Sequence, residues 1–254
     1  MLFTWTSFGI LIGVVAVVTA SLHLIQRWVP HHRREKHNDV AGFVFAAIGV
    51  FYAVLVAFVI IALWTDNNTA RQTTYSEAND LAAVYWLSRQ MPLAQGVPLE
   101  HLTLDYANTA INQEWPLMAR HQSSPAATQL IYQMRDEAFS MNPVTPRDQV
   151  IFEEVTDSVT ALAADRRTRL DAIGSGVPSF LWVTLIGGGV ITIGFTFLFG
   201  LSSTWVHVAM VGLLAAVIVT SLILISDLNY PFAGPGKIGP EAFEVFLARL
   251  PPPR

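Results

Sequence analysis

The chain has 254 residues, of which 52% are hydrophobic and only 13% are charged, against about 25% charged residues in a typical soluble domain. It has no cysteine, which excludes disulfides, thiolate catalysis and Cys-based metal centres, and its net charge of −4 argues against general nucleic-acid binding. The charge deficit is concentrated in four apolar blocks, which indicates membrane spans rather than one large soluble core.

Each of the four blocks reaches spanning length without an Asp, Glu, Lys or Arg inside it. No basic residue precedes the first block, which favours a retained span over a cleaved signal peptide, with cleavage after Val18–Ala20 as the alternative. The sequence therefore predicts two transmembrane hairpins, 1–64 and 177–228. Their predicted spans are 5–26 and 40–64 in the first hairpin, and 177–201 and 205–226 in the second.

The segment 65–176, between spans two and three, has helical patterning. Pro98 is predicted to mark a helix start, and Ser124 and Thr145, each followed by a proline, are typical N-caps. The tail 229–254 combines a Pro/Gly loop with a short amphipathic helix, predicted to lie against the helical bundle or the membrane surface. The predicted fold is an all-α integral membrane protein: four transmembrane helices with a helical extramembrane segment between spans two and three.

Orientation is predicted from basic residues in short connections. Arg27, Arg33, Arg34 and Lys36 lie between spans one and two, and none lies between spans three and four. This pattern favours a cytoplasmic first connection, with both termini and the large helical segment on the outer side of a bacterial plasma (inner) membrane. Arg166, Arg167 and Arg169, close to span three, argue against that orientation.

Span two carries a ridge of small residues at steps of three and four, which lets helix backbones approach closely. The ridge is predicted to pack against another helix, within one subunit or between subunits. It consists of Gly42, Ala46, Gly49, Ala53 and Ala57.

The opposite face of span two carries bulky apolar residues and continues into a polar stretch. Phe51, Leu55 and Phe58 are candidates for a hydrophobic pore neck that gates by dewetting. The candidates for a wet vestibule beyond it are Thr65, Asp66, Thr69 and Thr73. The alternative is that the phenylalanines face lipid and the polar stretch is a solvated helix surface.

Other chemistry is weakly supported. Asp39 is placed to cap span two, and its combination with His31, His32 and His37 lacks the spacing of a metal site, so no metal and no cofactor are predicted. The best acidic candidates for attracting cations in the helical segment are Glu77, Asp80 and Glu114. No nucleophile–base set or phosphate-binding loop is present, so we do not expect an enzyme.

Four stretches carry a family resemblance: "HNDVAGFVFAAIGVFYAVLVAFVIIALW", "EWPLMAR", "GFTFLFG" and "DLNYPFAG". In this order they resemble the bacterial bestrophin-like family of four-span membrane proteins, a domain of unknown function more distantly similar to bestrophin anion channels. The motif positions singled out are His37, Asn38, Asp39, Asp227, Pro231, Phe232 and Gly234. The resemblance implies a homo-oligomer whose second span lines the pore, and it places the helical segment in the cytoplasm, contrary to the charge pattern. The tail lacks the acidic calcium-binding run of true bestrophins.

Two functions remain open at this stage. The first is a homo-oligomeric ion channel in contact with membrane lipid and inorganic ions. The second is a non-conducting membrane scaffold or sensor whose helical segment binds a partner. A transporter is a weaker third idea, because no ionisable residue lies deep in a span.

Overall fold

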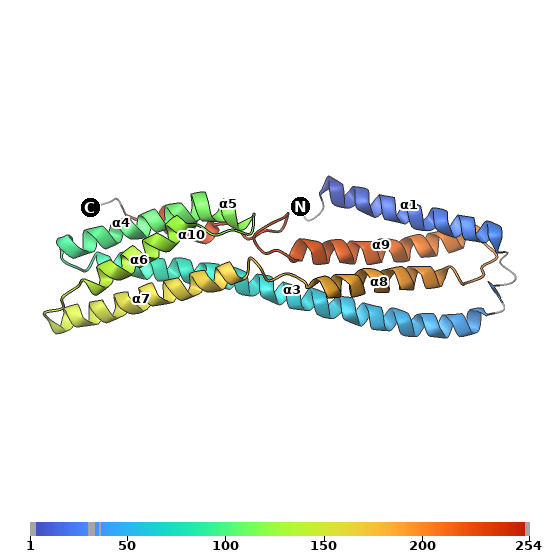
Figure 1. Ribbon diagram of the computed structural model, residues 1–254, viewed down its shortest axis with the longest axis horizontal. Coiled ribbons are helices and arrows are strands. Elements are labelled where there is room, and N and C mark those ends of the chain that lie inside the picture. The colour runs from blue at the N-terminus through green and yellow to red at the C-terminus, as the bar shows by residue number, and fades with distance from the viewer. Residues whose placement is uncertain (1–3, 30–33, 36, 252–254) are drawn as a thin grey trace. The chain divides into compact units, whose positions relative to one another are not determined.

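The computed structural model describes residues 4–29, 34–35 and 37–251, and every regular element in them is a helix (Figure 1). Four of these helices are long and apolar enough to cross a membrane. The predicted fold class, an all-α integral membrane protein, is therefore confirmed. The chain divides into two compact units. We call Met1–Thr65 with Gly176–Asn229 the membrane unit, and Asp66–Ser175 with Tyr230–Arg254 the helical unit.

The membrane unit contains α1 (Trp5–Trp28), the first part of α3 (Asn38–Ser88), α8 (Ser179–Thr196) and α9 (Thr204–Leu228). Helix α9 packs against both α1 and α8. Helix α8 ends at Thr196, five residues before the predicted end of the third span at 201, and a short turn of i→i+3 hydrogen bonds follows it. Small residues let α8 come close to its neighbours, because a Cβ at Gly188 would lie only 2.8 Å from Tyr52 Cδ2.

The helical unit contains the remainder of α3, α4 (Leu93–Thr109), the π-helical turn η1 (Ala110–Glu114), α5 (Trp115–Met118), α6 (Pro125–Phe139), α7 (Pro146–Asp171) and α10 (Glu241–Ala248). Its core includes Leu81, Tyr106, Met134 and Leu162, all nearly inaccessible to solvent. Bulky apolar residues at helical spacing from separate helices therefore give this unit a hydrophobic core of its own.

Two of the three helix starts predicted from prolines in this unit are confirmed. Ser124 accepts a hydrogen bond from the backbone N–H of Ala127, and Thr145 forms a reciprocal capping box with Asp148. The prediction for Pro98 was wrong: α4 begins at Leu93, and Pro98 lies inside it. Backbone bonds from Gln95 and Gly96 to the Pro92 carbonyl already form the first turn, so Pro98 lies in the second turn and leaves the Ala94 carbonyl without its usual helical donor.

The tail packs on the helical unit. Phe243 and Phe246 of α10 are buried in its core, and the Trp115 indole donates to the Ile238 carbonyl at 3.0 Å. Of the two positions predicted for the amphipathic helix, the bundle is therefore the one it occupies.

Candidate pore-lining face of helix α3

One side of the first part of α3 is committed to the interior of the membrane unit. Tyr52, Val56, Val59 and Leu63 are buried at helical spacing, in one cluster with residues of α8 and α9. This buried seam fixes which sides of α3 remain free within one chain, because residues three and four apart share a face.

The neck candidates lie away from the buried seam. The side chains of Phe51 and Phe58 are 79% and 69% exposed, and Leu55, between them, is partly buried. Two phenylalanines with most of their area uncovered need an apolar neighbour outside the single chain, which is either lipid or another protein surface.

The small-residue ridge is also open in a single chain. Ala46, Ala53 and Ala57 are exposed, and Gly42 and Gly49 are partly buried. Among the described residues, no atom of another helix comes within 4 Å of where a Cβ at either glycine would lie. The ridge therefore does not pack within the described part of its own chain, which leaves a second chain or lipid as its neighbour.

The vestibule candidates lie farther along the same helix. Thr65 and, in the helical unit, Asp66 and Thr69 are exposed, whereas Thr73 is partly buried. The Thr65 hydroxyl donates to the Ile61 carbonyl one turn back at 2.9 Å, so it is satisfied by its own helix. Asp66 and Thr69 keep their polar groups available to water.

The "HND" motif performs a structural role. The Asn38 side-chain amide donates to the Gly200 carbonyl at 2.8 Å and accepts from the Gly200 N–H at 3.0 Å. This pair joins the start of α3 to the connection between α8 and α9. His37 is exposed, and Asp39 lies in the first turn of α3 rather than at its cap position. His31 and His32, the other members of the loose metal set, lie outside the described residues.

The "DLNYPFAG" motif is also structural. Asn229, which sequence reasoning did not single out, accepts from the Val177 N–H at 2.6 Å and so joins the end of α9 to the residues before α8. Phe232 is buried against Trp115, Pro231 is buried, and Gly234 has a φ of +83° that favours glycine. Asp227 is partly buried in the last turn of α9.

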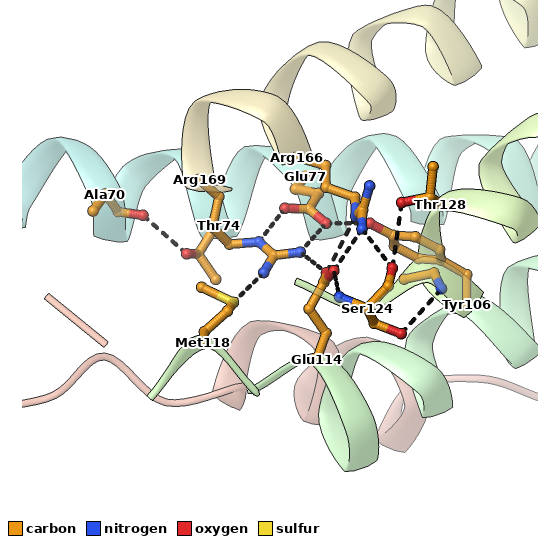
Figure 2. A network of polar contacts seen from close by, with 11 residues as sticks. Ala70, Thr74, Glu77, Tyr106, Glu114, Met118, Ser124, Thr128, Arg166 and Arg169 are labelled. Atoms are coloured by element: carbon orange, nitrogen blue, oxygen red, sulfur yellow. Dashed lines mark hydrogen bonds and ion pairs between the residues drawn. The ribbon is translucent and has the colours of Figure 1, made fainter. Parts of the chain in front are cut away.

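A buried ionic network lies inside the helical unit, and it corrects one expectation (Figure 2). Arg169 bonds Glu77 at 2.5 and 2.8 Å and Glu114 at 2.8 Å, and Arg166 bonds Glu114 at 2.5 Å. Glu77 and Glu114 are fully buried and neutralised. They therefore do not face a cation pathway, and only Asp80 of the three acidic candidates stays partly exposed.

The pKa shifts follow from burial and pairing. Burial acts to raise the pKa of Glu114, but hydrogen bonds and charges from Arg166 and Arg169 outweigh it, so that pKa is lowered. Burial, and then the charge of Glu77, raise the pKa of Tyr106, whose hydroxyl donates to Glu77 at 2.5 Å. Both shifts favour the observed arrangement, in which Glu114 is a carboxylate paired with arginines and Tyr106 is a neutral hydroxyl that donates.

Among the described residues, no group of three His, Asp or Glu side chains is close enough to hold a metal ion.

The protein-family model of the Bestrophin-like domain matches residues 12–243 of the chain. The chain belongs to the bestrophin-like family. The predicted family membership is confirmed, and this bestrophin-like protein is an integral membrane protein in contact with lipid.

No curated protein matches this bestrophin-like chain. A solved structure described as "Crystal structure of a membrane protein P143A" has a TM-score of 0.64 and 12% sequence identity. The match covers 91% of the bestrophin-like chain and 95% of the other. At this identity the match supports the fold, which is shared with a membrane protein over nearly the whole length of both chains.

Proposed function

We propose that the protein is a homo-oligomeric ion channel of the bacterial plasma membrane, with α3 lining its central passage. The observation that carries the proposal is the exposure of Phe51 and Phe58 on a helix whose small-residue ridge has no neighbour in its own chain. Membership of the bestrophin-like family supports the same assembly.

The two open features of α3 fit one oligomer. The ridge from Gly42 to Ala57 lets helices from neighbouring copies approach closely by van der Waals packing. Phe51 and Phe58 then face the axis as a hydrophobic neck that excludes water when closed. The exposed Asp66 and Thr69 then follow as a polar vestibule beyond the neck. Because the proposed chemistry is conduction, we also propose that the protein is not an enzyme.

The direct test is ion flux in proteoliposomes. The channel proposal predicts flux through the purified protein, and a changed flux in the double variant Phe51→Ala/Phe58→Ala at unchanged expression and oligomeric size. Phe180→Ala is the matched control, because Phe180 is 71% exposed on α8 and outside the proposed neck. This control is expected to conduct like the parent protein.

Two results would overturn the channel proposal: a monomer by mass measurement in detergent, or no flux in any form. Either would favour the non-conducting scaffold or sensor, whose spans only anchor the helical unit. Equal flux in the parent protein, the double variant and the control would keep conduction but remove α3 from the neck.

We also propose the orientation that the basic first connection favours, with the helical unit on the outer side. Because the chain has no cysteine, single cysteines can report it without background. The two reporter variants are Ser140→Cys and Ser202→Cys. Ser140 lies in the helical unit, Ser202 lies in the connection between α8 and α9, and both residues are exposed. A membrane-impermeant maleimide added to spheroplasts is expected to label the first and spare the second. The reverse pattern would invert the proposed orientation.

A further inference from the structure

An apolar pocket lies in the membrane unit at the end where α8 gives way to α9. Its volume is about 350 Å³, and six of its eight lining residues are apolar. Much of its wall is formed by Phe45 of α3, Phe199 of the connection between α8 and α9, and Met210 and Leu214 of α9. A pocket of this lining, on a unit built to sit in a bilayer, suits a hydrocarbon chain.

The polar end of the pocket is formed by His207 and Thr196. The buried imidazole has Nδ1 3.1 Å from Gln26 Nε2 and Nε2 3.0 Å from the Thr196 carbonyl oxygen. An amide nitrogen only donates and a carbonyl only accepts, so this arrangement assigns a neutral His207 with its proton on Nε2. The imidazole is therefore fully used in holding α1, α8 and α9 together.

Arg34 supplies an uncompensated positive charge beside that polar end. Its Nη1 donates to the carbonyl of Phe197 at 2.9 Å, and Phe197 directly follows Thr196 of the pocket wall. Only 8% of Arg34 is exposed, yet its Nε has no hydrogen-bond partner and no carboxylate pairs with it among the described residues. A buried guanidinium without a counter-charge is costly, and an anion bound beside it would lower that cost.

The position of Arg34 favours a lipid as the source of that anion. Arg34 lies in the connection between α1 and α3, where spans end and lipid headgroups lie. The sequence adds Arg33 and Lys36 to the same connection. Clustered basic residues at the end of a span attract anionic headgroups, and a guanidinium can donate two parallel hydrogen bonds to a phosphate.

We propose that this pocket binds an anionic phospholipid, with one acyl chain between Phe45 and Leu214 and its phosphate accepting hydrogen bonds from Arg34. The site needs only that the unit is embedded in a bilayer, so it does not depend on ion conduction. It would join α3, α8 and α9 through a ligand taken from the membrane itself.

The test uses the full-length protein purified in detergent and stripped of lipid. Phosphatidylglycerol or phosphatidylcholine with identical acyl chains is added back, and bound lipid is counted by native mass spectrometry. The parent protein is expected to retain phosphatidylglycerol preferentially. Arg34→Gln is expected to reduce this preference about tenfold, because the lipid phosphate loses a hydrogen bond from a charged donor. Arg27→Gln is the control, because Arg27 is exposed at the end of α1, and it should keep the preference.

A second pair of variants tests the acyl-chain pocket. Leu214→Trp fills the pocket and is expected to reduce retention of both lipids, whereas Leu213→Trp, at a neighbouring position 69% exposed and outside the pocket lining, should not. If Arg34→Gln does not give a monodisperse protein, the two tryptophan variants alone test whether the pocket binds lipid. Equal effects of the two tryptophans would then overturn the proposal.

Three further outcomes would overturn the proposal. The first is equal retention of both lipids by the parent protein, and the second is an equal loss of preference in Arg27→Gln and Arg34→Gln. The third is thermal stabilisation by inorganic phosphate alone that matches the effect of phosphatidylglycerol, which would make this a site for a free anion.

Discussion

Glu77 of α3 and Arg169 of α7 are paired through two hydrogen bonds of 2.5 and 2.8 Å, with both side chains inaccessible to solvent. The guanidinium also lies 4.6 Å from the centre of the Trp115 ring. The desolvation cost of burying this pair is offset because each partner neutralises the other and most of their remaining polar atoms are hydrogen-bonded. The pair therefore fixes how α7 packs on the second part of α3.

Removing one partner should be severely destabilising. Arg169→Leu leaves Glu77 buried without its counter-charge, and we expect the free energy of unfolding to fall by about 3–5 kcal/mol. Thermal unfolding followed by circular dichroism in detergent measures the loss. Arg167→Leu, two residues away and exposed, is the control and should unfold like the parent protein. Similar losses in the two variants would contradict the role assigned to Arg169.

Removing both partners should be milder than removing one. In Glu77→Leu/Arg169→Met no unpaired charge remains, because Arg166 still neutralises Glu114. We expect the double variant to unfold at a higher temperature than Arg169→Leu. A double variant as unstable as the single one would show that the hydrogen bond from Tyr106 to Glu77, rather than charge balance, dominates the site.

Asp80 gives the helical unit a predicted pH dependence. Burial, and then the charges of Asp165 and Glu77, raise the pKa of Asp80 to about 6. The unfolded value is about 3.9, so the folded protein binds the proton more tightly and its stability falls as pH rises through that window. Asp80→Asn removes this loss. We expect a gain of about 1 kcal/mol near pH 7.5, after allowing for solvent screening, and no gain near pH 4.

The measurement for Asp80→Asn is the midpoint of thermal unfolding at both pH values. Asp136→Asn serves as the control, because Asp136 is exposed on α6, and it should show no pH-dependent gain. A stabilisation of Asp80→Asn that persists unchanged at acid pH would contradict the assignment, since the parent carboxyl is then protonated.

The sequence predicted well those structural features that depend on residues close together in the chain, namely the membrane-spanning helices and two helix starts. Within the part of the chain that the structure describes, uninterrupted apolar runs identified the four helices able to span a membrane, and Ser124 and Thr145 identified two helix starts. The Glu77–Arg169 pair was missed because its partners are 92 residues apart. Composition therefore suggested that Glu77 faced solvent, and Arg169 entered only as a charge near the third span.

The candidate neck is predicted by sequence only in part, for a related reason. Helical periodicity places Phe51 and Phe58 on one face of α3 and Gly42 and Gly49 on another, and both faces are open in the described chain. A side chain against lipid and one against a dewetted pore have the same apolar character. Periodicity thus identifies a face, while the identity of its neighbour depends on assembly.

Asn38 should matter more for stability than its exposed neighbour. Its amide satisfies both the N–H and the carbonyl of Gly200, which would otherwise lose their partners near the end of the spans. We expect Asn38→Ala to lower the free energy of unfolding by about 1–3 kcal/mol. His37→Ala, beside it and exposed, is the control and should leave thermal unfolding unchanged. Equal melting temperatures for the two variants would contradict the structural role assigned to the Asn38 amide.

Three consecutive glycines in α8 give the most discriminating test of packing in the membrane unit. A Cβ at Gly188 would lie 2.8 Å from Tyr52, and one at Gly189 would lie 3.0 Å from both Tyr52 and Ile218, whereas one at Gly187 would meet nothing within 4 Å among the described residues. Overpacking of this kind typically costs about 1–3 kcal/mol. We therefore expect Gly188→Ala and Gly189→Ala to lower the unfolding temperature in detergent and Gly187→Ala to leave it unchanged or raise it slightly, because alanine favours helix. A loss of the same size at Gly187 would show that backbone flexibility in α8, rather than the close approach of Tyr52, is what these glycines provide.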